Sequence, residues 1–187
     1  MPKISVISGV YNGTDCPHFR ESIESILGQS FSDFEFIICD DGSTDNTPKV
    51  LSEYEKRDRR VKIIRNERNL GLAAALNRCI ELSNGEYIAR HDLDDYSAKE
   101  RLKKQLSYLE EHGEVGLLGT GVWLFDECGV WGKEIMPRRV LKEDFLFNNP
   151  YKHGSVMFRR SELVRAGGYR VAKETLRNED YDLFMRM

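Results

Sequence analysis

Short apolar runs alternate with amphipathic stretches along the first 112 residues. The runs are rich in β-branched and aromatic residues, as buried strands are, and lie at 4–10, 34–39, 61–64 and 86–89. Between them and after the last one, apolar residues recur at the spacing of one helix face. Strands that alternate with amphipathic helices form mostly parallel sheets. The pattern therefore predicts an α/β fold with a Rossmann-like sheet and helices on both faces.

Residues that favour helix N-termini mark where several helices are expected to begin. Thr44 or Asp45 can cap the second helix, and Ser97 with Glu100 forms a capping-box pattern before the fourth. Ser161 is expected to cap a short helix further on.

The second half of the chain follows a less regular pattern. Residues 115–125 are apolar with three glycines and predict one or two strands, and 155–158 predicts another. Without an internal repeat or a linker, we expect a single domain over 1–187. The expected helix at 179–187 has no C-cap signal, which predicts a natural protein that continues beyond Met187.

Polar residues follow three of the four expected strands. Residues 11–12 follow the first, 40–41 the second and 92–95 the fourth. Ligands of such sheets bind beyond the carboxyl ends of the strands, so these segments should meet at one edge. Taken alone, the segment 40–43 has two equally good interpretations. It can be a turn that starts a helix, or it can supply a carboxylate that accepts a hydrogen bond from a ligand's N–H or hydroxyl.

Asp92, Asp94 and Asp95 place three carboxylates within four residues. Carboxylates so close repel one another unless a cation is present or their pKa values rise. Their oxygens are hard ligands that suit Mg²⁺ or Mn²⁺. The alternative is a solvated acidic turn.

Three further features carry a functional and a structural interpretation. Residues 69–71 open a helix, where backbone N–H groups can bind a phosphate, but an ordinary glycine loop has the same sequence. His153 could contact a phosphate or an acceptor, although a histidine beside a strand is often structural. Arg101 is expected on a solvated helix face.

Asp180 shares one helix face with three apolar residues. In the expected helix, Leu183, Phe184 and Met187 follow it at helical spacing and should face the body of the protein. Asp180 is then carried inward, and an inward carboxylate needs a partner or a chemical task. Asp182 points elsewhere and is expected in solvent.

Charge and cysteine usage limit the partners. The net charge of -3 gives no basic field for nucleic acid, and no apolar run approaches the length of a membrane span. The four cysteines are widely spaced, which argues against a zinc site and fits reduced thiols. With no signal peptide, these features predict a cytoplasmic protein.

Taken together, the motifs resemble the inverting glycosyltransferases of family 2, nucleotide-sugar transferases with the GT-A fold. The matching segments cover nearly the whole chain and are 6–12, 38–45, 69–71 with Asn77, 85–88, 92–95, 153–155, 167–169 and 179–183. The resemblance implies that residues 1–112 bind the nucleotide sugar and that 113–187 face the acceptor.

The resemblance also implies roles for individual residues. Tyr11 and Asp41 would hold the nucleotide base, with Asp45 nearby, and Asp180 would be the catalytic base. The implied metal ligands for Mg²⁺ or Mn²⁺ are Asp94, Asp92 and Asp95. The implied donor-binding residues are Val10, Tyr11, Asn12, Asp40, Asp41, Asn69, Gly71, Asp92 and His153. The chain departs from the family pattern at His91, where an apolar residue is usual.

The implied activity is transfer of a sugar, with UDP as the expected carrier, to a hydroxyl of a glycan or lipid-linked acceptor. Such enzymes make polysaccharides or other cell-surface glycans. The expected location is the cytoplasm, at the inner face of the membrane where the missing C-terminus allows peripheral association.

Two alternatives to a glycosyltransferase belong to other functional classes of protein. A phosphatase of the haloacid dehalogenase type would use Asp92 as nucleophile, but Tyr96 replaces its expected threonine, and that motif belongs near the first strand. A binding module with the same fold would recognise a nucleotide or glycan without turnover.

Overall fold

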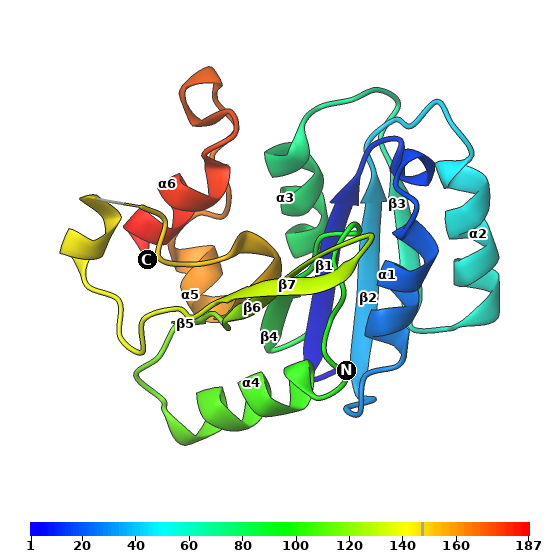
Figure 1. The fold of residues 1–187 in the computed structure, drawn as a ribbon. Coiled ribbons are helices and arrows are strands. Elements are labelled where there is room, and N and C mark those ends of the chain that lie inside the picture. Colours follow the sequence, from blue (N-terminus) through cyan, green and yellow to red (C-terminus); the bar gives the residue numbers. More distant parts are fainter. Residues whose placement is uncertain (147) are drawn as a thin grey trace.

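The computed structural model describes residues 1–146 and 148–187 and is built around one six-stranded sheet (Figure 1). Its strand order is β3-β2-β1-β4-β8-β5. The strands are β1 (Ile4–Val10), β2 (Phe34–Asp40), β3 (Val61–Arg65), β4 (Tyr87–Arg90), β8 (Met157–Arg159) and β5 (Leu117–Leu118). The first four are parallel, and β8 joins β4 in antiparallel register.

Helices cover both faces of this sheet, as the sequence predicts. One core contains apolar residues of α1 (Phe19–Leu27), α2 (Thr47–Arg57) and α4 (Arg101–Glu111). The other contains those of α3 (Leu72–Leu82), α5 (Arg160–Arg165) and α6 (Glu179–Arg186). Successive strand residues point to opposite faces, so each buried strand supplies both cores.

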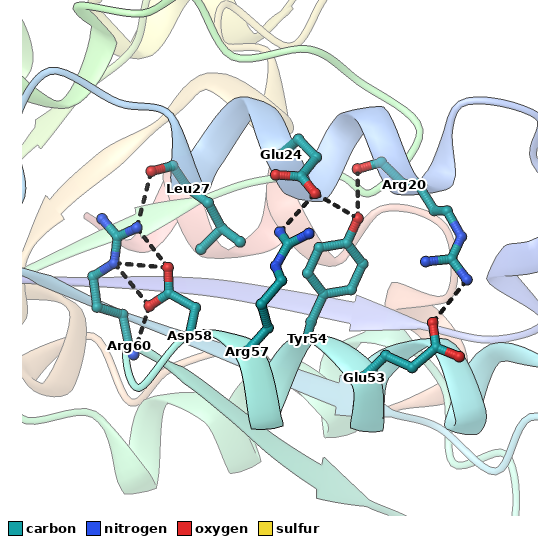
Figure 2. Close-up of polar contacts among 8 residues, drawn as sticks. All are labelled: Arg20, Glu24, Leu27, Glu53, Tyr54, Arg57, Asp58 and Arg60. Atoms are coloured by element: carbon teal, nitrogen blue, oxygen red, sulfur yellow. Dashed lines mark hydrogen bonds and ion pairs between the residues drawn. The ribbon is translucent and has the colours of Figure 1, made fainter.

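A polar seam joins α1 to α2 at the edge of the first core (Figure 2). The Tyr54 hydroxyl donates to Glu24 Oε1 over 3.0 Å, and Arg57 pairs with the same oxygen at 2.6 Å. Arg60 extends the seam by donating to the carbonyl of Leu27 at 3.0 Å. Because the Tyr54 ring is buried, its hydroxyl needs such a partner, and the seam fixes α2 beside α1.

Three expected caps are not formed. α4 begins at Arg101, and the Ser97 hydroxyl accepts the Arg101 guanidinium instead of a backbone N–H. α5 begins at Arg160, so Ser161 lies within it. Asn46 occupies the N-cap position of α2, while Asp45 accepts the N–H groups of Thr47 and Thr14. At Ser97 and Asp45, a hydrogen-bond partner other than the expected helix N-terminus engages the side chain.

The second half of the chain adds β5 and a separate hairpin of β6 (Val122–Asp126) and β7 (Gly129–Glu134). Residues 115–125 thus contain β5 and most of β6, in agreement with the one or two strands expected there. In Figure 1 the hairpin runs across the main sheet. Its Phe125 ring lies 5.1 Å from the ring of Tyr96 and 5.8 Å from that of His18. The hairpin therefore packs against the loop 91–96, which carries Asp92, Asp94 and Asp95 and is called the acidic loop below.

Four short 3-10 helices complete the described elements: η1 (Gly13–Asp15), η2 (Lys142–Leu146), η3 (His153–Ser155) and η4 (Lys173–Thr175). All four cysteines are free thiols. Among residues 1–146 and 148–187, no helix combines the length and apolar character needed to cross a membrane.

Candidate functional site

The loops after β1 and β2 meet at the carboxyl edge of the sheet, as expected. The N–H of Asn12 donates to Ser43 Oγ at 2.9 Å, and the N–H of Thr44 donates to Asn12 Oδ1 at 2.9 Å. The carbonyl of Val10 accepts the N–H of Asp41 at 2.8 Å. Asn12 holds these contacts from a left-handed backbone conformation, which asparagine tolerates better than most residues. Beside them Tyr11 is 48% exposed.

Asp41 is buried and ties this edge to the loop before α3. Its Oδ1 accepts Asn66 Nδ2 at 2.6 Å and the N–H of Leu70 at 2.9 Å, and its Oδ2 accepts the N–H of Gly71 at 2.8 Å. An ionised carboxylate has about four acceptor positions, so one remains for a ligand. The N–H groups of Leu70 and Gly71 are engaged by Asp41. The expectation that this loop leaves them free for a phosphate is not met.

Asn69 and Asp40 complete this side of the site. Asn69 Oδ1 also accepts the N–H of Gly71, at 3.0 Å, which fixes the turn into α3. Asp40 is fully buried, and its Oδ1 accepts the N–H of Ser43 at 2.9 Å. Its Oδ2 lies 3.3 Å from Arg65 Nε. Asp40 thus shapes the turn below the expected base-binding position.

Asp92 follows β4 and is held by the arginine that ends this strand. Its Oδ1 accepts a hydrogen bond from Arg90, and the Asp92 side chain is 31% exposed. Burial by itself would raise the pKa of Asp92, but the Arg90 guanidinium, with smaller contributions from His153 and His91, outweighs it and lowers this pKa below its usual value. The sequence did not single out Arg90. A charged residue ending a buried β-prone run was the available signal.

Asp94 and Asp95 lie on the exposed side of the same loop. Desolvation and the neighbouring charges of Asp92 and Asp94 raise the pKa of Asp95 to about 6. Loss of solvation and like charges nearby both disfavour the ionised form of a carboxyl group.

The segment 153–155 packs against this acidic loop. A Cβ atom on Gly154 would fall 2.7 Å from Asp92 Oδ2 and 2.8 Å from Asp95 Oδ2, so a larger residue here would displace these carboxylates. Next to it, His153 Nε2 lies 2.7 Å from the hydroxyl of Tyr169. Burial, with the nearby Arg90 charge, lowers the pKa of His153 to about 3, so the imidazole is neutral at pH 7. The structure therefore unites two motifs far apart in the sequence.

Asp180 lies in the first turn of α6 and is half-buried. Its Oδ2 accepts Asn149 Nδ2 at 2.7 Å, a contact that no sequence pattern indicated. Asp182 is not solvated, contrary to expectation, because it pairs with Arg170 at 2.9 Å and Arg186 at 2.8 Å and is 17% exposed. Met187 is 37% exposed, so the apolar face of this helix ends at Phe184.

The prediction for Arg101 was wrong. Its side chain is buried and donates to the carbonyl of Arg90 at 2.5 Å, to Ser97 Oγ at 3.2 Å and to Gln105 Oε1 at 3.1 Å. The arginine therefore supports the acidic loop from beneath instead of facing solvent.

The three acids do not form a preassembled metal site. Within the part of the chain that the structure describes, no three His, Cys, Asp or Glu side chains are arranged to hold a metal ion together. Asp92 pairs with Arg90, and Asp94 is exposed to solvent. A magnesium-type ion on a nucleotide, however, needs only one or two carboxylates besides phosphate and water.

The fold places the chain in the GT-A class. It superposes on Staphylococcus aureus TarS 1–349 in complex with UDP with a TM-score of 0.78 and 23% identity, over 98% of this chain and 54% of that one. It superposes on the mannosyltransferase PcManGT from Pyrobaculum calidifontis, in complex with GDP-Man and Mn²⁺, with a TM-score of 0.69 and 20% identity, over 91% and 48%.

The chain belongs to glycosyl transferase family 2, whose model matches residues 5–176. EpsE of Bacillus subtilis (strain 168), named as a glycosyltransferase, is 44% identical over 99% of this chain and 66% of its own length. The amylovoran biosynthesis glycosyltransferase AmsE of Erwinia amylovora is 33% identical over 98% and 68%. The chain thus spans about two thirds of the length of these relatives. The family resemblance of the sequence motifs is confirmed.

Proposed function

We propose that this protein is an inverting glycosyltransferase that moves a sugar from a nucleoside-diphosphate sugar, most simply a UDP-sugar, to a hydroxyl of an acceptor. The observation that carries the proposal is the meeting of the acidic loop with the segment 153–155, where Gly154 lies against Asp92 and Asp95. Family membership and the UDP complex of TarS support the same conclusion.

The donor would bind along the carboxyl edge of the sheet. Tyr11 offers an exposed ring for the base, and Asp41 keeps one free acceptor position for a base N–H. Val10, Asn12, Asp40, Asn69 and Gly71 would shape this end of the donor site. Asp92 and His153 would face the ribose and the diphosphate. Neutral His153 can donate one hydrogen bond without adding charge.

Asp94 and Asp95, with Asp92 behind them, would hold Mg²⁺ or Mn²⁺ on the diphosphate. When bound, such a cation supplies Lewis-acid stabilisation of the negative charge that grows on the leaving diphosphate. The Mn²⁺ in the PcManGT complex supports this assignment.

Asp180 would act as the general base. An acceptor hydroxyl is a poor nucleophile until a base removes its proton, and a carboxylate opposite the leaving group does this in a single displacement that inverts the anomeric carbon. The Asn149 amide holds Oδ2 of Asp180, which fixes the orientation of this carboxylate.

We place the reaction in the synthesis of a polysaccharide or other cell-surface glycan, with a glycan or lipid-linked acceptor, at the cytoplasmic side of the membrane. The biosynthetic role in the name of AmsE supports this assignment. The phosphatase alternative has no support, since the family match is to glycosyltransferases and Asp92 is engaged by a buried arginine.

The proposal is tested with a panel of nucleotide sugars in a thermal-shift assay with and without Mn²⁺, followed by release of the nucleoside diphosphate. We expect UDP-sugars to raise the melting temperature in a metal-dependent way and UDP to be released with acceptor present. Binding of UDP without transfer or hydrolysis would favour the binding module. Phosphate release through a phosphoaspartate at Asp92 would overturn the proposal.

A further inference from the structure

Arg90 is a charged residue in the interior of the protein. It ends β4, between the two central cores, and its side chain is 0% exposed. Two of its nitrogens donate hydrogen bonds, one to the carbonyl of His91 and one to Asp92 Oδ1. Its Nε finds no partner among the described residues. A buried guanidinium is costly unless it is paired, so the Asp92 carboxylate is the contact that accounts for it.

Arg101, the second buried arginine near the acidic loop, does not pair with Asp92. Arg101 lies beneath the same loop, but its hydrogen bonds go to neutral groups: the carbonyls of Arg90 and Val156, Ser97 Oγ and Gln105 Oε1. Among the described residues, Arg90 is thus the only cation within ion-pair distance of Asp92. The opposite oxygen of Asp92, Oδ2, faces Gly154.

We infer that Arg90 is a positioning residue of the donor site, which holds the Asp92 carboxylate in one orientation against Gly154 before any ligand arrives. The inference rests on the proposed function. Without Arg90, Asp92 would face the negative charges of Asp94 and Asp95 uncompensated, and its side chain could turn away from the site. Groups that orient the residues around a metal or ligand are worth about 10- to 100-fold in affinity or activity.

The first test is Arg90→Met, with UDP affinity measured by calorimetry at saturating Mn²⁺. We expect UDP to bind about 10- to 100-fold more weakly. Arg159→Met is the matched control. Arg159 lies on the neighbouring strand β8 and pairs with Tyr87, at the opposite end of β4 from the acids. Its guanidinium donates to the backbone carbonyls of Leu109, His112 and Val115. Arg159→Met should lower the melting temperature and leave UDP affinity unchanged.

A double-mutant cycle separates positioning from general damage to the core. If Arg90 acts through Asp92, Arg90→Met should cost almost no further affinity in an Asp92→Asn protein, because contacting residues are not additive. A folded Arg90→Met protein that binds UDP like the wild type would overturn the inference. So would an equal loss in both backgrounds.

Should Arg90→Met fail to fold, Arg90→Lys carries the same test. Lysine keeps the interior charge but cannot reproduce the two directed contacts of the guanidinium. We expect the Arg90→Lys protein to bind UDP more weakly than the wild type, and the same change to cause no such loss in the Asp92→Asn background. An Arg90→Lys protein with wild-type UDP affinity would overturn the inference. A wild-type protein that does not bind UDP with metal would instead overturn the proposed function.

Discussion

The side-chain amide of Asn149 donates a hydrogen bond to Oδ2 of Asp180 over 2.7 Å. Oδ1 of the same carboxylate accepts the N–H of Tyr181 at 2.8 Å. Asp180 is therefore held at both oxygens, in the first turn of α6, by a loop from another part of the chain and by its own helix. A carboxylate oriented in this way is suited to take a proton from an acceptor hydroxyl that comes within hydrogen-bond distance of it.

Replacement of Asp180 with asparagine should lower turnover about 10²- to 10⁴-fold, the usual contribution of general acid–base catalysis. Asparagine keeps the shape of the side chain but cannot accept the proton. Steady-state transfer rates on full-length protein with its acceptor measure this effect, and UDP affinity should hardly change. Glu179→Gln, one residue away, is the control and should keep most of the activity. An Asp180→Asn enzyme with more than half the wild-type rate would remove the residue from the mechanism.

Chelation of divalent metal should weaken UDP binding at least tenfold, a loss of about 1.4 kcal/mol. The reason is that the carboxylates of the acidic loop cannot approach a diphosphate without a cation between them. Calorimetry with and without EDTA measures the effect. Asp94→Asn should reproduce it more fully than Asp95→Asn, because the family resemblance makes Asp94, the second acid of the D-x-D motif, the metal ligand and gives Asp95 a supporting role. Equal UDP affinity in the presence of EDTA would contradict the metal assignment.

Asp41→Asn should destabilise the protein by about 1–3 kcal/mol, the scale for a buried donor left without its partner. The new amide would turn a donor toward one of the three N–H groups that now point at Asp41. Urea denaturation measures the loss. If Asp41 also accepts a hydrogen bond from the base, UDP will weaken more than a ribose diphosphate without a base. Equal weakening would limit Asp41 to holding the loop.

Asp45 should make stability depend on pH in the acid range. Burial opposes its ionisation, but hydrogen bonds from Thr14 and Thr47 prevail and lower the pKa of Asp45 from 3.8 to about 2. Because the folded-state pKa is depressed, this stabilisation is complete above about pH 4 and is lost as the pH falls toward 2. Asp45→Asn should therefore cost about 1 kcal/mol at pH 7 and less at pH 3.

Denaturation curves at both pH values check this prediction. Asp15→Asn, an exposed acid on the neighbouring 3-10 helix, is the matched control and should change stability little at either pH. A stability difference between the wild type and Asp45→Asn that stays constant from pH 7 to pH 3 would contradict the stated role of the charge.

The alternation of strands and helices, and the sheet edge at which the acids gather, could be predicted from the amino-acid pattern. Hydrophobic periodicity is a local property, and in a parallel sheet it dictates which face each residue buries and where each strand ends. The strand pattern alone therefore assigns Asp41 and Asp92 to one edge. The spacing of Asp180 to Leu183 and Phe184 likewise places its side chain toward the body of the protein.

The pairing of polar groups, in contrast, could not be predicted, because it depends on contacts that form in the folded chain. Arg101, expected in solvent, is buried because the carbonyl of Arg90 and the side chains of α4 surround its guanidinium. Asp182, also expected in solvent, pairs with Arg170. Asn149 reaches Asp180 across 31 residues of sequence. A long polar side chain can be buried or solvated with the same local pattern, and distant segments that meet only in the folded chain supply the donor or acceptor that decides between them.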